Sequence, residues 1–369
     1  MFIIQREIEN QISEKLFKNG MVVILGPRQS GKTTLSKKII ETFGGDGMYY
    51  NCEFAEVRKH LVLGKPEILK EFIGDNKIIV LDEAQTVPNI GKILKVFYDT
   101  YPEIQIIATG SSSFDLANKI KEPMTGRAYE FILPPLTINE IKTIKHVDEN
   151  ILRELMLYGN YPAVVLAHTE SEKQEQLKRI ATNYLFKDVY IFEALRNPKT
   201  FEDLLIHLAQ SLGSTVSAGK LGKELGVAPA TIEKYIRLLE QSFVIKRIYS
   251  YSKNYANELK KSYKIYFYDN GIRNALLGSF SNFEQDKGVL FENLFFIEKF
   301  KKTLQQVFPE RISFWRTKEG YEIDFILEKQ NILYAYECKY GNEEHSFKTF
   351  LKYYSNSVVQ IMRPKDLLE

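Results

Sequence analysis

The sequence predicts a multidomain α/β protein whose first third contains a parallel sheet. A chain of 369 residues is too long for one ordinary hydrophobic core. Continuous apolar runs within residues 21–25, 77–85 and 104–113 fit strands buried on both faces, as in parallel sheets. A helical middle and a second strand-rich segment follow these runs. We therefore expect domains at residues 1–133, 134–200, 201–275 and 276–369.

Charge and cysteine content narrow the class of protein. The chain has 50 Lys and Arg against 47 Asp and Glu, a formal net charge of +3, so its total charge indicates no polyanionic partner. No apolar stretch is long enough to cross a bilayer, and acidic residues follow the start too soon for a signal peptide. Cys52 and Cys338 lie far apart in apolar surroundings, which favours reduced thiols over a disulfide. We expect a cytoplasmic protein with no membrane partner.

The first apolar run leads into a complete phosphate-binding loop. The pattern is Gly26-x-x-x-x-Gly31-Lys32-Thr33, with a strand before it and a helix after it. Glycines let backbone N–H groups wrap a phosphate, and the helix N-terminus adds partial positive charge. In this pattern Lys32 reaches the β and γ phosphates, and the Thr33 hydroxyl binds Mg²⁺. The sequence therefore predicts that ATP binds to Gly26, Pro27, Arg28, Gln29, Ser30, Gly31, Lys32, Thr33 and Thr34.

The next two apolar runs end in polar residues that complete this site. Asp82 follows the second run and can hold the Mg²⁺ through water, while Glu83 can polarise the attacking water. The third run ends near Thr109 and Ser111, of which Ser111 is the preferred contact for the γ-phosphate or the lytic water. In open α/β sheets ligands bind at the carboxyl ends of the strands, where these residues lie.

The segments GPRQSGKTT, LDEAQ, TGSSS and GRAYEFILPPLTINEI resemble the AAA-family ATPases of archaea and bacteria that carry a C-terminal domain of unknown function. Later segments, including YGNYPAVV, LFKDVY, YDNGIRNALLG and GVLFENLFF, extend the resemblance over nearly the whole chain. The resemblance implies that Arg127 senses the γ-phosphate, from its own subunit or across a boundary in a homo-oligomer. Arg28 is a rival candidate, and a surface ion pair is the alternative role of Arg127.

The middle of the chain predicts a helical lid followed by a winged helix-turn-helix. Residues 134–200 show helical periodicity, which we expect Pro198 to end. Residues 201–251 then give helix, helix, turn, helix and strand. The third helix is expected to expose Glu233, Lys234 and Arg237 and to bury Ile232, Tyr235, Ile236 and Leu239. The segment 246–264, with six Lys or Arg and one Glu among tyrosines, could bind DNA; a protein-protein module is the alternative.

Near the C-terminus, charged residues interrupt an apolar hairpin. If residues 328–331 form a four-residue loop, Leu327 faces Ile332 and Glu322 faces Glu337. Glu322, Asp324, Glu337 and Lys339 then share one face, opposite an apolar face of Tyr321, Ile323, Phe325, Leu327, Tyr336, Cys338 and Tyr340. Two opposed acids repel unless a cation lies between them, so this arrangement favours a metal site; a solvated sheet face is the alternative.

Asp324 and Glu337-x-Lys339 also resemble the PD-(D/E)xK nucleases, although the leading proline is missing. That resemblance implies a restriction-endonuclease-like α/β domain in which Asp324, Glu337 and Glu292 bind Mg²⁺ and Lys339 orients the attacking water. The sequence thus predicts an ATPase coupled to nucleic-acid binding, with Mg²⁺-dependent cleavage as one option. The alternative is a nucleotide-switched regulator or scaffold that binds DNA or protein and never cuts.

Overall fold

The computed structural model describes residues 4–44, 46–111, 126–190, 197–252, 263–306 and 308–368. These form two compact units, one of residues 1–136 with 241–243 and the other of residues 137–240 with 244–369. The domain boundaries expected after residues 133, 200 and 275 stay predictions.

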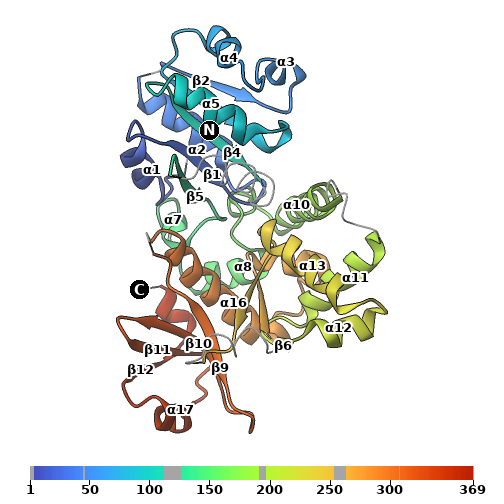
Figure 1. The fold of residues 1–369 in the computed structure, drawn as a ribbon. Coiled ribbons are helices and arrows are strands. Elements are labelled where there is room, and N and C mark those ends of the chain that lie inside the picture. The colour runs from blue at the N-terminus through green and yellow to red at the C-terminus, as the bar shows by residue number, and fades with distance from the viewer. Residues whose placement is uncertain are drawn as a thin grey trace. The chain divides into compact units, whose positions relative to one another are not determined.

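A five-stranded parallel sheet forms the centre of the first unit (Figure 1). Its order is β2-β3-β4-β1-β5, and every neighbouring pair is parallel. The predicted strands are the three central ones, and all their residues are buried. The strands are β1 (Met21–Leu25), β2 (Gly47–Asn51), β3 (Ile78–Asp82), β4 (Gln105–Gly110) and β5 (Ala128–Ile132). This confirms the α/β class and the parallel sheet.

Helices between the strands make the crossovers that parallel strands require. Helix α1 (Glu9–Lys15) precedes β1, and the connecting helices are α2 (Lys32–Thr42), α3 (Ala55–Arg58), α4 (Pro66–Ile73), the short η1 (Ala84–Thr86) and α5 (Ile90–Thr100). Ile12 of α1 and Leu35 of α2 pack on Val22 and Ile24 of β1 in one buried cluster. Because β1 pairs with β4 on one side and β5 on the other, the sheet order reverses at β1, which is where such sheets bind ligands.

The second unit begins with helices α7 (Ile138–Lys142), α8 (Glu149–Tyr158), α9 (Pro162–Val165) and α10 (Glu170–Tyr190). The expectation that Pro198 ends this helical stretch is wrong, because Pro198 opens α11 (Pro198–Gln210). Asn197 caps that helix by accepting from Thr200 N at 3.3 Å, and a first-turn proline loses no helical hydrogen bond. Among the described helices none is both long and apolar enough to cross a membrane.

A small antiparallel sheet of order β6-β8-β7 follows α11. Its elements along the chain are β6 (Thr215–Val216), α12 (Ala218–Leu225), α13 (Pro229–Gln241), β7 (Ile245–Tyr249) and β8 (Tyr263–Phe267). The predicted helix, helix, helix and strand are all present, with β6 and β8 in addition. The burial predicted for α13 is confirmed at Ile232, Tyr235, Ile236 and Leu239. Assignment of these residues to a winged helix stays a prediction.

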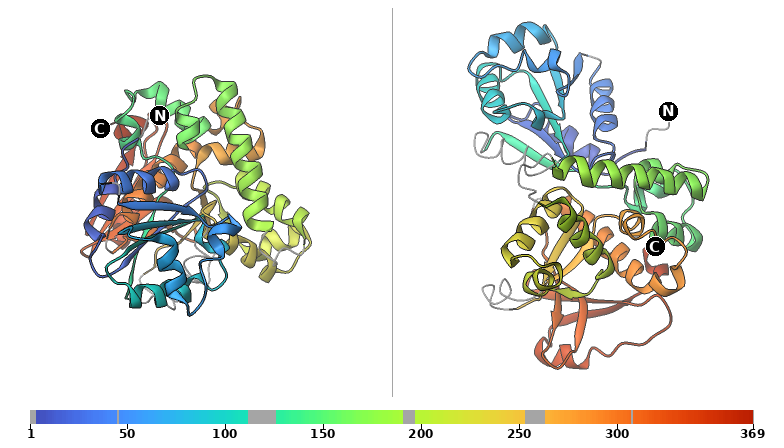
Figure 2. Two further views of the ribbon diagram at one scale, coloured as in Figure 1. Left: turned by 90° about the horizontal axis from the view of Figure 1, so that it is seen from above. Right: turned by 90° about the vertical axis from the view of Figure 1, so that its right-hand side faces the viewer.

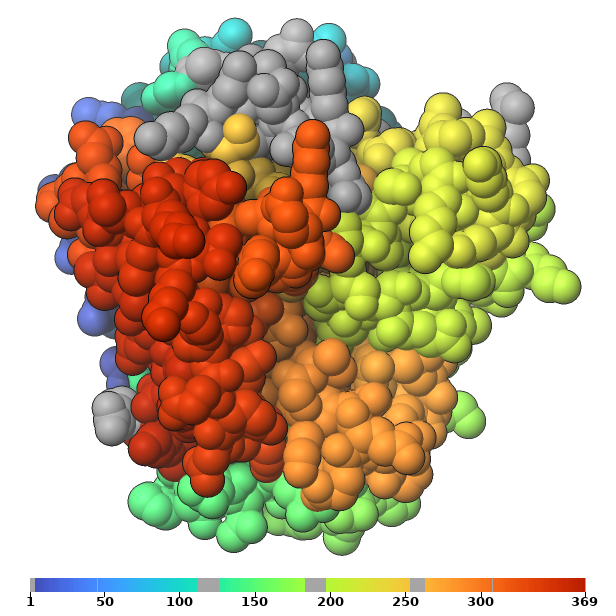
Figure 3. Space-filling view, turned by 90° about the horizontal axis from the view of Figure 1, so that it is seen from below, coloured from blue at the N-terminus to red at the C-terminus, as the bar shows by residue number. Residues whose placement is uncertain are grey.

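A four-stranded mixed sheet of order β12-β11-β10-β9 ends the second unit (Figure 2). Helix α15 (Asn270–Leu277) comes first, followed by α16 (Phe283–Leu304), β9 (Ile312–Arg316), β10 (Glu322–Lys329), β11 (Ile332–Cys338), α17 (Lys348–Tyr353), β12 (Ser357–Met362) and η3 (Pro364–Leu367). Phe295 of α16 packs on Phe325 and Tyr336, whereas Phe350 of α17 belongs to the cluster around Trp315. The surface in Figure 3 is shared by these C-terminal strands, in red, and the helices α11–α13, in yellow-green.

The predicted register of the β10–β11 hairpin is wrong by one residue pair. Gln330 and Asn331, with φ of 48° and 65°, form a two-residue loop, so Leu327 pairs with Tyr334 rather than Ile332. Two residues in the left-handed region match the twist of a tight hairpin. The last pair of the β10–β11 ladder at this end joins Phe325 and Tyr336. In the same register the next pair would place Asp324, rather than Glu322, opposite Glu337.

A register shift in the β9–β10 pairing also corrects the prediction of a single apolar face. The shift lies between Ile323 and Ile326 of β10. An extra residue in one strand breaks the alternation of side chains. Ile323 and Ile326 consequently pack on the side of α17, while Phe325 packs against α16. Apolar side chains therefore lie on both faces of this sheet.

Candidate functional site

The loop between β1 and α2 has the backbone geometry of a phosphate cradle. Gly26 has φ of 156°, and a Cβ placed there would lie 2.2 Å from the carbonyl oxygen of Leu133. Gly31, with φ of 99°, is the N-cap of the helix α2. Both positions require glycine, so the spacing of the motif reflects where the chain turns and where it enters the helix. The loop amides and the start of α2 lie together at the carboxyl edge of the sheet.

Two cations secure this loop. Lys32 is 5% exposed, and its Nζ donates to the carbonyl oxygens of Gly26 at 2.9 Å and Pro27 at 2.8 Å. Arg6 donates to the carbonyl oxygens of Ser30 and Pro134, each at 2.6 Å. Sequence reasoning missed Arg6, because no motif marks it and only the fold brings it to the loop. Arg6 thus ties the phosphate loop to the chain that follows β5.

Asp82, at the end of β3, is the centre of a network of hydroxyl groups. Its Oδ2 accepts from Thr33 Oγ1 at 2.8 Å and from the hydroxyl of Tyr49. Its Oδ1 accepts from Thr109 Oγ1, so Thr109 contacts Asp82. A hydroxyl and a carboxylate, both hard oxygen donors, therefore meet beside the loop. This donor set fits a magnesium ion, which Thr33 and Asp82 would hold.

Glu83 occupies a strained turn beside Asp82. Its φ of 52° is in the left-handed region, which costs free energy for a residue other than glycine. Its Oε2 accepts from Gln85 Nε2 and from Ser111 Oγ, the latter at 3.4 Å. Gln85 Nε2 also lies 3.2 Å from Ser111 Oγ. The structure thus brings Glu83 and Ser111 together and adds Gln85, whose position in the segment DEAQ was the only sequence signal for it.

The electrostatics around Glu83 combine burial with nearby cations. Burial raises the pKa of the Glu83 carboxyl, while Lys32 and Arg28 oppose that rise in pKa. Arg28 therefore acts on the carboxylate from inside the loop. A carboxyl with a raised pKa is a better proton acceptor than an exposed glutamate at the same pH, provided that it is ionised.

Arg127 lies at the other edge of the sheet. Its carbonyl oxygen accepts from the backbone N of Met21, the first residue of β1. At about 3.3 Å per residue, the length of β1 places the phosphate loop about 16 Å away. Its guanidinium pairs with Asp99 at 3.0 Å, and its side chain is 41% exposed. Sensing of the γ-phosphate within one chain is therefore wrong for Arg127; action across subunits stays a prediction.

A buried lysine occupies the centre of the acidic group predicted to bind metal. Lys264 of β8 is 2% exposed, and its Nζ lies 2.6 Å from Glu322, 3.3 Å from Glu292 and 3.6 Å from Asp324. We call Lys264 and these three acids the carboxylate cluster. The hydroxyl of Tyr266 also donates to Glu292, at 2.5 Å. Lys264 therefore places one positive charge among the three acids.

Glu337 and Lys339 lie next to the carboxylate cluster. Glu337 Oε1 lies 2.9 Å from Lys339 Nζ and 3.1 Å from His345 Nδ1. Its Oε2 is buried without a hydrogen-bond partner, and burial raises the pKa of this carboxyl to about 7. Asp324 Oδ2 accepts from the backbone N of Cys338 at 2.9 Å. The three residues of the nuclease-like pattern are thus neighbours in the fold.

The predicted magnesium set of Glu292, Asp324 and Glu337 does not form a ligand group. In the part of the chain that the structure describes, no three His, Cys, Asp or Glu side chains are arranged to hold a metal ion. The ammonium of Lys264 contacts two of the three proposed ligands. Lys264 offsets part of the repulsion among Glu292, Glu322 and Asp324, while burial and the charge of Asp324 still raise the pKa of Glu337. The donor set therefore does not fit the implied magnesium ion.

The basic segment 246–264 is also less available than its composition indicated. Lys264 is buried, and Arg247, 8% exposed, lies 2.7 Å from both Glu233 and Glu240. Glu233 was expected on the exposed face of α13 but is half-buried in this ion pair. Residues 253–262 lie outside the described residues. At least two of the six cations therefore neutralise acids of the same unit.

Comparison with known families adds to this geometry. Residues 18–142 match the AAA domain. Residues 149–282 match a domain of unknown function (DUF8612), and residues 287–365 match another (DUF4143). The chain accordingly has an AAA-type P-loop domain followed by a C-terminal domain of unknown function, as the resemblance implied. Such a domain supports ATP binding and hydrolysis in general.

Relatives that match most of this chain occur in bacteria and archaea. An uncharacterized protein of Mycobacterium tuberculosis is 25% identical over 344 residues, which is 92% of this chain and 74% of the relative. An uncharacterized protein of Methanocaldococcus jannaschii is 27% identical over 369 residues, with 94% and 81% covered. One from Haemophilus influenzae is 26% identical over 359 residues, with 89% and 84% covered. The similarity therefore extends over both units.

Two solved structures share weaker similarity. The RuvB Holliday junction branch migration motor of Thermotoga maritima is 18% identical, covers 66% of this chain and 90% of its own, and has a TM-score of 0.32. A katanin structure is 15% identical, covers 64% and 82%, and also has a TM-score of 0.32. The AAA assignment therefore rests on the sequence match and on the geometry of the loop.

Proposed function

We propose that this chain hydrolyses ATP at the carboxyl edge of the β1–β5 sheet. One observation carries the proposal: Glu83 lies next to Asp82, which accepts a hydrogen bond from Thr33. These residues lie beside the phosphate loop, whose carbonyl oxygens accept from Lys32. The loop amides bind the phosphates, and Lys32 neutralises charge on the β and γ phosphates. Thr33 and Asp82 would hold Mg²⁺, which when bound neutralises the charge that develops on the phosphate oxygens.

Glu83 is the general base in this proposal. It takes a proton from water as the water oxygen bonds to the γ-phosphorus, and the bond from that phosphorus to the bridging oxygen of ADP breaks. ADP and inorganic phosphate leave, and Glu83 returns its proton to solvent. Gln85 and Ser111 position the carboxylate through their contacts with Glu83 Oε2. Support for these roles comes from the AAA match over residues 18–142.

The test compares steady-state hydrolysis with nucleotide affinity. Glu83→Gln should lower kcat by about 100- to 10,000-fold while the affinity for Mg·ATP stays near that of wild type, because removing a general base affects the chemical step. Lys32→Ala should instead weaken binding itself. Glu41→Gln, at an exposed position of α2, is the matched control and should change neither quantity. Wild-type turnover by Glu83→Gln would overturn the assignment.

We also propose that the second unit binds nucleic acid without cutting it, and that nucleotide state changes this affinity. The observation that favours binding over cleavage is Lys264, which contacts the acids that a nuclease would use for Mg²⁺. The winged-helix assignment supports nucleic acid as the ligand, since α13 has Lys234 and Arg237 exposed while its apolar residues are buried. The two acids of α13, Glu233 and Glu240, pair with Arg247, so Lys234 and Arg237 are the charges that would contact a groove edge or backbone.

A cleavage assay and a binding assay together test this second proposal. The protein with Mg²⁺, with or without ATP, should leave duplex, single-stranded and junction DNA intact. The affinity of the protein for DNA should differ between its ATP-bound and ADP-bound states. Lys234→Glu with Arg237→Glu should weaken retention, whereas Lys178→Glu, at an exposed position of α10, should not. Mg²⁺-dependent cutting that Glu337→Ala abolishes would refute the non-cleaving assignment and support the nuclease alternative.

A further inference from the structure

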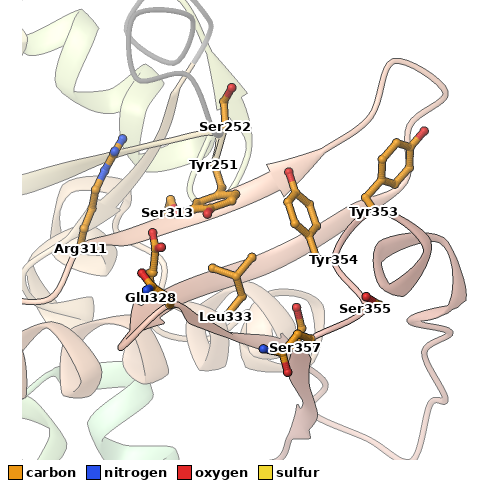
Figure 4. Close-up of a pocket in the computed structure, with 12 residues that line it drawn as sticks. Tyr251, Ser252, Arg311, Ser313, Glu328, Leu333, Tyr353, Tyr354, Ser355 and Ser357 are labelled. Atoms are coloured by element: carbon orange, nitrogen blue, oxygen red, sulfur yellow. The ribbon is translucent and has the colours of Figure 1, made fainter.

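The second unit has a pocket of about 580 Å³ on the α17 side of its C-terminal sheet (Figure 4). Glu328 and Leu333 line it at the hairpin end of β10 and β11. Glu322 and Asp324 of the carboxylate cluster lie toward the opposite end of β10. Four residues of strand, about 13 Å, separate Asp324 from Glu328. The pocket is therefore a site distinct from the nuclease-like residues.

Aromatic rings form one wall of the pocket. Tyr251, which follows β7, meets Tyr354 edge to face with ring centroids 5.6 Å apart. Trp315 lies behind this wall, 5.8 Å from Tyr353 and 6.4 Å from Tyr354, and Phe350 lies 5.2 Å from Trp315. Tyr353 is nevertheless 63% exposed. The wall thus offers an accessible ring that is held in place by a buried aromatic cluster.

Polar groups complete the lining. Hydroxyls come from Ser252, Ser313, Ser355 and Ser357, and amides from Asn331 and Asn356. Ser357 Oγ is buried without a hydrogen-bond partner. Figure 4 shows Arg311 and Glu328 at one end of the pocket and Tyr353 at the other, with Tyr251 and Tyr354 between them. The lining therefore combines ring faces, neutral donors and acceptors, and at one end a cation, Arg311, and a carboxylate, Glu328.

These features narrow the class of ligand. A purely apolar ligand would leave the buried Ser357 Oγ without a hydrogen-bond partner. A divalent cation would find a single carboxylate, Glu328, where several oxygen ligands are needed. A nucleotide matches the ring faces, the neutral polar groups and Arg311, since its base has a face for stacking and an edge with donors and acceptors, and its phosphate is an anion. Its size also falls within the usual range of ligand pockets, about 300–1,000 Å³.

We propose that this pocket binds one unpaired nucleotide of a single-stranded nucleic acid. The base stacks on Tyr353, its edge meets the serine and asparagine groups, and its phosphate lies near Arg311. A paired base cannot enter, because both its edge and its faces are occupied within the duplex. The inference rests on the proposed nucleic-acid binding of the second unit and assigns it a strand-selective site.

Fluorescence anisotropy of the full-length protein with a labelled single-stranded oligothymidine and a labelled hairpin duplex tests the proposal. Loss of one base stack costs about 1–3 kcal/mol, so Tyr353→Ala should weaken single-strand binding by about 5- to 150-fold and leave duplex affinity unchanged. Tyr353→Phe keeps the ring and should bind as wild type does. Arg311→Gln should reduce the salt dependence of binding by about one phosphate contact. Tyr321→Ala removes another exposed tyrosine, 56% exposed and outside the pocket, as the matched control.

Three results would overturn the proposal in distinguishable ways. If wild type binds the single strand and Tyr353→Ala binds it equally well, the pocket assignment fails while nucleic-acid binding survives. If wild type binds neither oligonucleotide, the proposed nucleic-acid function fails and this inference fails with it. Loss of affinity for an aromatic peptide, without loss for oligothymidine, would also refute a nucleotide site. Thermal unfolding of each variant, followed through Trp315, establishes that the pocket variants are folded.

Discussion

Replacement of Lys264 by methionine should destabilise the second unit strongly. Met keeps most of the side-chain volume but leaves Glu292, Glu322 and Asp324 without the ammonium that contacts them at 2.6 to 3.6 Å. At an effective dielectric constant of about 20, one contact at 3.3 Å is worth about 5 kcal/mol before desolvation. The cost of desolvating Lys264 offsets much of this Coulomb attraction. Breaking a buried ion pair typically costs about 3–5 kcal/mol of stability. Glu322 is 28% exposed, so we expect the lower part of that range.

Urea unfolding at pH 7, monitored by tryptophan fluorescence, measures this loss. The chain has one tryptophan, Trp315, which is 6% exposed and reports on the second unit. Lys287→Met is the control, because the ion pair of Lys287 with Glu284 is exposed and such pairs contribute about 0–1 kcal/mol. A loss below about 1 kcal/mol for Lys264→Met would refute the role of Lys264 as the counter-ion of the cluster.

The same variant should show a particular pH dependence. Burial raises the pKa of Glu292 from 4.5 to about 7, although Lys264 lowers it. A carboxyl whose pKa is raised by folding contributes stability that is present below its unfolded pKa and lost as pH rises through its folded pKa. Without Lys264 the folded pKa of Glu292 rises further. The deficit of Lys264→Met should therefore be larger at pH 8 than at pH 5, and equal deficits would contradict the reasoning.

Two further predictions concern the ATP site. Burial raises the pKa of Glu83, and the hydrogen bond that Gln85 donates lowers it. Gln85→Ala removes that hydrogen bond and should therefore move the acid limb of the kcat–pH profile to higher pH. An acid limb that stays in place would argue against Glu83 as the base. Arg127→Ala should change hydrolysis by less than about twofold in dilute protein, because Arg127 lies at the edge of the sheet opposite the phosphate loop and its exposed pair with Asp99 contributes only about 0–1 kcal/mol to stability. A large loss under those conditions would mean that Arg127 reaches the nucleotide within its own chain.

Most of the first unit could be predicted from the sequence, and the reasons are local. The strands β1, β3 and β4 are buried on both faces, so each is an uninterrupted apolar run. The edge strands β2 and β5 are half-buried and carry mixed sequences such as GMYYN, which have no clear period. The hairpin was predicted, but its register was not, because nothing in EKQN indicates that Gln330 and Asn331 alone turn the chain.

The candidate sites also differ in whether local sequence could predict them. The phosphate loop and Asp82-Glu83 were found because their chemistry depends on spacing within a few residues. Lys264 was missed, since its partners Glu292 and Glu322 lie far along the chain and its neighbours in the sequence are basic and aromatic. From its sequence neighbours, Lys264 was predicted to be part of a DNA-binding segment, whereas in the fold it is a buried counter-ion. Arg127 was misplaced for a related reason, because the sequence does not show which end of β5 faces the loop.

The position of β8 has a practical consequence for dissecting this protein. Tyr266 stacks on Phe296 and lies 5.3 Å from Phe325, so β8 contributes both rings and charge to the core around the C-terminal sheet. A truncated fragment beginning at residue 276 would lack that strand. Such a fragment should be insoluble when expressed, and inactivity in it would say nothing about the intact enzyme. Fragments meant to isolate the C-terminal fold should therefore begin no later than α11.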